Sequence, residues 1–158
     1  MAKNKFPFYR QLDYRDCGST CLRMIAKFHG KTFSREFLRE KASITREGVT
    51  MAGIIDAAEI IEMRTLGMRI SLESLVNEAP TPFIVSWRQK HFVVVYKTSK
   101  TKVYVADPAQ GLLTYTHKEF HNAWTNNTDG TGFVLLLEPN TNFHKLQDDK
   151  TKKKGFSF

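Results

Sequence analysis

The stretch DCGSTCLRMIAKFHG, residues 16–30, decides how the first half of this chain folds. Its apolar residues recur at the spacing of one helix face, at Cys21, Leu22, Ile25 and Phe28. Asp16 fits the N-cap position of such a helix, and Gly30 fits a C-terminal stop. The stretch therefore predicts a helix that begins at Cys17.

Further helices and then strands are expected along the rest of the chain. Ser34 can cap a short helix that ends near Lys41, and Thr50 can begin a longer one that runs to a stop at Gly67. Beyond the two prolines that follow, short apolar runs separated by turns predict strands at 83–87, 91–96, 102–107, 112–116 and 132–138. The segment HKEFHNAW, residues 117–124, is expected to form a helix between the last two strands.

The apolar runs of the second half indicate a sheet that is covered on both faces, by the preceding helices on at least one of them. We therefore expect an α+β fold with a mainly helical first half. A chain of 158 residues with 41% hydrophobic content is long enough for one compact domain, which we assign to residues 1–139. The polar, basic residues 140–158 are expected to be a linker that leaves the domain.

The net charge of +8 is concentrated at the two ends of the chain. Lys and Arg outnumber Asp and Glu by 11 to 4 in residues 1–46 and by 5 to 2 in residues 144–158. The basic residues of the first segment fall among the apolar positions of predicted helices, as they do on an ordinary solvent-exposed face. The sequence also has no basic motif with interspersed aromatic residues. Nucleic-acid binding is therefore not expected. A signal peptide and an apolar run of membrane-spanning length are also missing from the sequence, which favours a soluble, cytosolic chain.

The two cysteines, Cys17 and Cys21, are four positions apart and so would lie on the same side of one helix. A disulfide between them would have to staple a single turn to itself, which disfavours a structural disulfide. A zinc site is equally poorly supported, because no second Cys/His pair stands at ligand spacing. We expect no metal and no cofactor.

Cys17 is the candidate nucleophile. The first turn of a helix supplies partial positive charge and free backbone N–H groups, which favour a thiolate. Gly18 would let a substrate backbone approach closely, and Gln11, six residues upstream, carries an amide that can donate to an oxyanion. A buried, inert cysteine is the ordinary alternative for a lone thiol, and it explains Cys21 better.

His91 begins one predicted strand and Asp107 ends the next, so a hairpin brings them together. If the paired residue numbers add to 198, His91 lies directly opposite Asp107 on one face, whereas a total of 199 separates the faces. A catalytic role predicts the first register, with Asp107 fixing the imidazole tautomer. Each residue alone has an ordinary interpretation, as a strand-edge histidine and a turn residue before proline. Trp87 can line a cleft, although a core or rim aromatic is the more common arrangement.

Taken together, these motifs resemble the bacteriocin-processing peptidase domain at the N-terminus of ABC transporters. The resemblance rests on Gln11, on Asp16-Cys17-Gly18-Ser19-Thr20-Cys21-Leu22, on Met24 with Phe28-His29-Gly30, on His91-Phe92-Val93-Val94-Val95 and on Val105-Ala106-Asp107-Pro108. It implies a papain-like fold, with N-terminal helices packed on a C-terminal antiparallel sheet. It also implies that Cys17 attacks, His91 acts as base and then acid, Asp107 orients the histidine and Gln11 stabilises the oxyanion.

The same resemblance implies a substrate and a cellular setting. The expected partners are a precursor peptide with a double-glycine (Gly-Gly or Gly-Ala) leader and the transmembrane and nucleotide-binding portions of an ABC transporter. The domain would lie on the cytoplasmic side of the membrane. The sequence has no glycine-rich phosphate loop, so this piece is not expected to bind ATP.

Two other functions stay open at this point. A degenerate relative could hold leader peptides for export without cutting them, although the joint presence of Cys17, His91, Asp107 and Gln11 argues against this. A basic adaptor for membrane or nucleic acid, acting through the KTKKK stretch at residues 150–154, would bind in a salt-sensitive manner.

Overall fold

The structure of this chain, a computed structural model, describes residues 5–44, 48–88, 90–125 and 129–147. Its helices are α1 (Cys17–Phe28), α2 (Arg35–Lys41), α3 (Met51–Ile60), α4 (Leu72–Glu78) and α5 (His117–Trp124), with short 3-10 helices η2 (Tyr14–Asp16) and η3 (Phe143–Lys145). Its strands are β1 (Met63–Ser71), β2 (Phe83–Trp87), β3 (His91–Thr98), β4 (Lys102–Asp107), β5 (Gly111–Thr116) and β6 (Thr131–Pro139). The strands form one antiparallel sheet in the order β1-β6-β2-β3-β4-β5.

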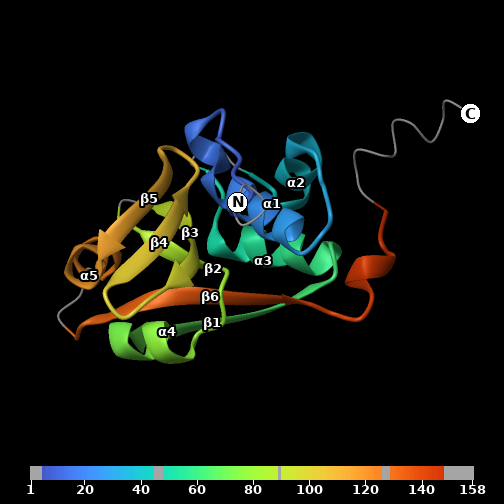
Figure 1. Ribbon diagram of the computed structural model, residues 1–158. Helices are drawn as coiled ribbons and strands as arrows, with labels where there is room; N and C mark the ends of the chain where they lie inside the picture. The colour runs from blue at the N-terminus through green and yellow to red at the C-terminus, as the bar shows by residue number, and fades with distance from the viewer. Residues whose placement is uncertain (1–4, 45–47, 89, 126–128, 148–158) are drawn as a thin grey trace, which may run out of the picture.

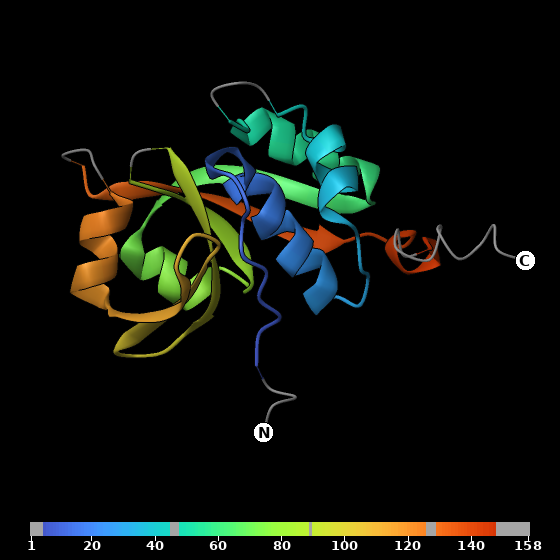
Figure 2. The ribbon, with the colours of Figure 1, turned by 90° about the horizontal axis from the view of Figure 1, so that it is seen from above.

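Helices α1, α2 and α3 cover one face of the sheet (Figures 1 and 2). Their buried side chains, among them Leu22, Leu38 and Ile54, form one core with strand residues such as Val94 and Leu135. The ends of these helices follow ordinary capping chemistry, because the side chains of Ser34 and Thr50 accept backbone N–H groups in the first turns of α2 and α3. The predicted helix boundaries of α1 and α2 are confirmed.

The opposite face of the sheet carries α4 and α5, which form a second core with the other half of the strand residues. Phe120 and Trp124 of α5 pack there with Trp87 of β2. Thr116 and Glu119 form a capping box that begins α5, as the HKEFHNAW segment predicts. The expected α+β class and a sheet covered on both faces are therefore confirmed.

One predicted element is wrong. The helix expected to run from Thr50 to Gly67 ends at Ile60, and residues 63–71 form strand β1 instead. Glu62 has a positive φ of 67°, which breaks the helix, and Gly67 lies inside the strand opposite Leu135 of β6. Strand β1 is held by a partner about 70 residues away, so local periodicity does not reveal it. It places a strand between the helices of the first half.

Part of the predicted linker packs on the domain. Phe143 is fully buried in the first core, and the Asn140 amide donates to the Glu62 carboxylate at 2.9 Å. Residues 148–158, which include the KTKKK stretch, lie outside the described residues. Among the helices in the described ranges, none has the length and hydropathy needed to cross a bilayer.

Candidate active site

Cys17 is the first residue of α1 and lies at the floor of a cavity of about 650 Å³. The residue is only 4% exposed, so what reaches the thiol must enter this cavity. The cavity walls come from the segment before α1, the segment before α3, the start of β3 and the turn after β4; they are Gln11, Tyr14, Gly48, Val49, Thr50, Lys90, His91, Phe92, Ala109 and Gln110. The fold thus brings Cys17, His91 and Gln11 to one cavity.

Asp107 lies behind His91, away from the cavity. Its Oδ1 accepts a hydrogen bond from Nε2 of His91 at 2.7 Å and another from the backbone N–H of Ala109 at 2.9 Å. The carboxylate is nearly fully buried, with 2% of its side chain exposed. Two donors therefore hold it in place, and it fixes which nitrogen of His91 is left for the thiol. That nitrogen is Nδ1.

The pairing register differs from the prediction. Val94 pairs with Ala106 and Val95 with Val105, so the residue numbers add to 200 instead of 198. Continued by one pair, this register sets Asp107 opposite Val93, two residues from His91. Since side chains alternate along a strand, His91 and Asp107 still share a face, as diagonal neighbours rather than direct partners. The correction preserves the predicted contact.

The charges around His91 favour its imidazolium form. Burial alone would lower the pKa of His91, but hydrogen bonds with Asp107 and with Cys17 outweigh it and raise the pKa to about 9. Burial likewise works against the Asp107 carboxylate, whose pKa is nevertheless lowered by the hydrogen bonds from His91 and Ala109. Near neutral pH the site therefore holds a positive imidazolium between the thiol and a carboxylate, which is the arrangement that stabilises a thiolate.

Gln11 is anchored close to this pair. Its backbone N–H donates to the carbonyl of Pro108 at 2.9 Å, and the neighbouring Arg10 guanidinium donates to the carbonyl of Ala109 at 2.8 Å. Both acceptors directly follow Asp107 in the chain. The buried Oε1 of Gln11 has no hydrogen-bond partner within the described part of the chain. This atom can accept a hydrogen bond from a group that enters the cavity, whereas the predicted oxyanion role belongs to the N–H₂ end of the same amide.

Two weaker cleft candidates are not brought into the cavity. A Cβ on Gly18 would lie 2.5 Å from Cγ1 of Val49 and 2.6 Å from Cδ1 of Ile54, so this glycine allows α1 to approach α3 closely. Trp87 is 6% exposed and packs against Tyr115 and Phe120 in the second core. Trp87 therefore occupies a core position, the arrangement that the sequence analysis favoured over a place in the cleft.

Asp16 behaves differently from the predicted N-cap. It occupies that position, but its side chain makes no capping hydrogen bond. The fully buried carboxylate instead contacts Arg35 and Arg39 of α2. Sequence reasoning missed this contact because the arginines are 19 and 23 residues downstream, on a helix whose orientation the sequence does not give.

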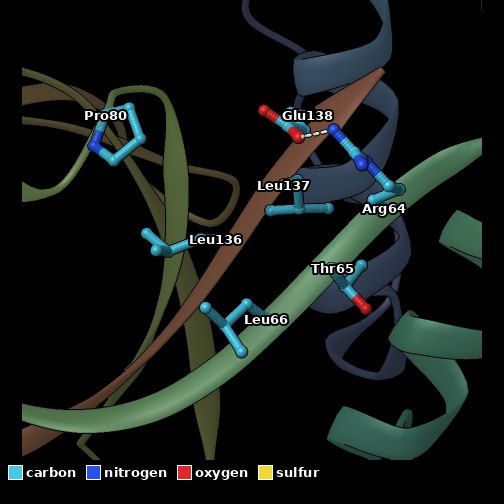
Figure 3. A pocket seen from close by; sticks show the side chains of 7 residues that line it. All are labelled: Arg64, Thr65, Leu66, Pro80, Leu136, Leu137 and Glu138. Carbon is cyan, nitrogen blue, oxygen red and sulfur yellow. Dashed lines mark hydrogen bonds and ion pairs between the residues drawn. The ribbon is translucent and has the colours of Figure 1, made fainter. Parts of the chain in front are cut away.

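A second hollow of about 330 Å³ lies over the paired strands β1 and β6, beside Pro80 (Figure 3). Leu66 and Leu136 face it, and Arg64 forms an ion pair with Glu138 at its rim. Its lining contains no cysteine and no histidine. The thiol chemistry therefore belongs to the cavity at Cys17.

The chain is similar in sequence to a known peptidase family and to parts of longer transport proteins. The model of the peptidase C39 family matches residues 5–142. The colicin V secretion/processing ATP-binding protein of Escherichia coli is 30% identical over 141 residues, covering 89% of this chain and 19% of that protein. The lactococcin-A transport/processing ATP-binding protein of Lactococcus lactis subsp. lactis is 32% identical over 164 residues, covering 99% and 22%. This chain thus spans about a fifth of the length of these relatives.

Solved structures with the same fold come from proteins of the same kind. A double glycine motif protease from an AMS/PCAT transporter, crystallised in complex with the leader peptide, has a TM-score of 0.79 at 27% identity, covering 86% of this chain and 93% of its own. The peptidase domain of the Streptococcus transporter ComA has a TM-score of 0.77 at 28% identity, covering 86% and 100%. These similarities confirm the papain-like fold that the sequence resemblance implies.

Proposed function

Because this chain belongs to the peptidase C39 family, we propose that it is the cysteine endopeptidase that removes the leader from precursor peptides after a double-glycine (Gly-Gly or Gly-Ala) motif. The observation that carries the proposal is that the Cys17 thiol and the His91 imidazole share one cavity, while the buried Asp107 carboxylate holds His91 from behind. A structure similar to this one is a double glycine motif protease bound to a leader peptide, which supports the choice of substrate.

The geometry suits acyl transfer through a thioester. The thiolate of Cys17 attacks the carbonyl carbon of the second leader glycine, and the carbonyl electrons move onto oxygen. The amide of Gln11 and the free N–H groups at the start of α1 donate to that oxyanion. When the C–N bond breaks, His91 gives its Nδ1 proton to the leaving amine and becomes neutral.

Hydrolysis of the thioester completes the cycle. The neutral His91 takes a proton from a water molecule, and the resulting hydroxide adds to the thioester carbonyl. The C–S bond then breaks, the thiolate forms again, and the leader leaves as a carboxylic acid that gives its proton to solvent. Asp107 keeps Nε2 engaged throughout, so that Nδ1 always faces the thiol. The imidazolium–thiolate pair is then restored.

The names of the relatives, which are secretion or transport and processing ATP-binding proteins, support a wider setting for this domain. We place it at the cytoplasmic side of a membrane, joined to the transmembrane and nucleotide-binding portions of an ABC transporter that exports the trimmed peptide. The segment after residue 139 is the proposed connection to them.

The test is mass spectrometry of a synthetic leader peptide that ends in Gly-Gly and continues for several residues, incubated with the whole chain. Cleavage is expected after the glycine pair, and it should disappear with Cys17→Ala or when the second glycine is replaced by valine. Leader binding without cleavage would instead indicate the module that recruits substrate and does not cut it. Cleavage that persists in Cys17→Ala would contradict the assigned nucleophile.

A further inference from the structure

Asp16, the residue before the nucleophile, is a fully buried carboxylate held by two arginines of another helix. Its Oδ2 accepts a hydrogen bond from Nε of Arg35 at 3.0 Å. Its Oδ1 lies 2.8 Å from Nε of Arg39 in an ion pair that lacks the alignment of a hydrogen bond. The two arginine side chains are themselves only about a quarter exposed. Such a triad ties the first turn of α1 to α2.

The surrounding charges leave this corner positive. On the segment before α1, Asp13 pairs with Arg15, and the positive charge of Arg39 also reaches Asp13. Glu36 approaches Arg35 only at 3.6 Å from an exposed position. Two carboxylates, Asp13 and Asp16, thus face three guanidinium groups. The thiol of Cys17 itself faces His91 and, further away, Cys21, and the Asp107 carboxylate reaches His91 and Cys21. Tyr14 and Lys90 share the cavity with Cys17.

A buried carboxylate beside the nucleophile works against catalysis unless it is neutralised, because a thiolate at Cys17 is repelled by a negative neighbour. We propose that Arg35 and Arg39 are positioning residues for the Cys17 thiolate: they fix Asp16 under the first turn of α1 and keep the local charge positive. This inference rests on the proposed function only in taking Cys17 as the reactive thiol.

Removing the Asp16 carboxylate and removing the arginines should shift the pH at which the Cys17 thiolate forms in opposite directions. Asp16→Asn keeps the shape of the side chain and leaves both arginines uncompensated, so the thiolate should form at a lower pH. Arg39→Gln removes one cation, and Arg35→Gln with Arg39→Gln removes both, so the thiolate should form at a higher pH. With Asp16 as a carboxylate, the local charge falls by one in Arg39→Gln and by two in the double variant. A purely structural role would loosen the same helix turn in every variant and would produce no ordered shift.

The experiment measures the rate of iodoacetamide alkylation of Cys17 in the whole chain between about pH 5 and 10, with the labelled peptide identified by mass spectrometry. The midpoint of the profile is expected to fall in Asp16→Asn and to rise in Arg39→Gln and further in the double variant, each by about half a pH unit or more. Lys41→Gln is the matched control, because Lys41 is a cation on α2 that lies over the Phe37 ring outside the triad. Its profile should match the wild type.

Arg39→Lys keeps the charge and should keep the wild-type midpoint. If Asp16→Asn fails to fold, the comparison of Arg39→Gln with Arg39→Lys still tests the inference. Equal midpoints in Arg39→Gln and Arg39→Lys, or shifts of the same sign in Asp16→Asn and Arg39→Gln, would overturn the inference. Alkylation does not require the peptide substrate. A failure of leader cleavage in the wild type would therefore count against the proposed function without affecting this result.

Discussion

His91 and Asp107 share a face of the β3–β4 hairpin because Tyr96 is an extra residue in β3. Near the turn, Thr98 pairs with Val103 and Lys97 with Tyr104, so the numbers add to 201, whereas beyond Tyr96 they add to 200. A regular ladder continued from the turn would set Asp107 opposite Val94 and put His91 on the other face. The bulge therefore shifts the register before the ladder reaches His91 and Asp107. The Tyr96 ring stacks on Phe6, with centroids 4.9 Å apart.

The contact between these two residues makes a prediction about pH. In Asp107→Asn the carboxylate that raises the pKa of His91 is lost, so that pKa should fall from about 9 toward its ordinary value of 6.5. The high-pH limb of kcat/KM should move down with it, because the imidazolium is lost earlier as pH rises. The maximal rate should fall by about 10³-fold or more. The measurement is leader cleavage as a function of pH.

Asp129→Asn is the matched control for that variant. Asp129 also accepts a backbone N–H two residues ahead, from Thr131, but in an exposed loop far along the chain from the site. Its profile should coincide with that of the wild type. A limb that stays near pH 9 in Asp107→Asn would show that Asp107 is not what raises the pKa of His91.

The same shift has a consequence for stability. A group whose pKa is higher in the folded state stabilises that state fully below its unfolded value, near 6.5 for His91, and loses this contribution as pH rises through about 9. The free energy of unfolding of the wild type should therefore exceed that of His91→Gln most at about pH 6. The difference should shrink by about 1–2 kcal/mol by pH 10, after allowance for solvent screening. Denaturant titrations at several pH values measure it, and a difference that grows with pH would contradict the argument.

How far the sequence predicts this molecule depends on whether the deciding contact is local. Helix α1, strands β2 and β4 and helix α5 were predictable to the residue, because each combines a clear period with a cap or turn signal. Strand β1 was not, since it pairs at the sheet edge with β6 and its Gly67 imitates a helix stop. The bulge at Tyr96 carries no local signal either, which is why the register was misjudged by two while the face was right.

The residues of the site also divide into those that local sequence reveals and those that only tertiary packing brings together. Cys17, His91, Asp107 and Gln11 stood out by residue type and by position at the ends of predicted elements, and the fold places all four at or directly behind one cavity. The partners of Asp16 depend on how α2 docks against α1, and Val49 joins the cavity only through the approach of α3. Both are products of tertiary packing that composition and spacing do not encode.

Gln11 gives a prediction about turnover. Gln11→Ala removes the amide that we propose donates to the oxyanion, so kcat should fall by about 10²-fold while KM stays nearly constant. Gln11→Glu should be slower still, because a carboxylate would face the negative oxygen. Steady-state kinetics on the leader peptide measure both, with the exposed Gln147→Ala as control. An unchanged kcat in Gln11→Ala would remove this side chain from the mechanism.

The two cysteines should differ sharply in reactivity. Cys21 is fully buried, burial raises the pKa of its thiol well above the ordinary value, and its Sγ donates to the carbonyl of Phe92 at 3.3 Å. Cys17 opens into the cavity beside His91. Brief treatment with iodoacetamide at about pH 7 should thus add one label per chain, on Cys17, and two after unfolding. Labelling of Cys21 at a comparable rate in the folded Cys17→Ala variant would contradict this assignment.

Gly18 links the packing of the helices to the position of the thiol. Because its missing Cβ would fall within 2.6 Å of both Val49 and Ile54, Gly18→Ala should push α1 away from α3. The expected cost is about 1–3 kcal/mol in the free energy of unfolding. A displacement of Cys17 on the order of 1 Å should also lower kcat by roughly 10²-fold. Adding Val49→Ala removes one of the two contacts and should recover part of both losses, whereas a wild-type kcat and unfolding midpoint in Gly18→Ala would show that the helix start tolerates the extra methyl group.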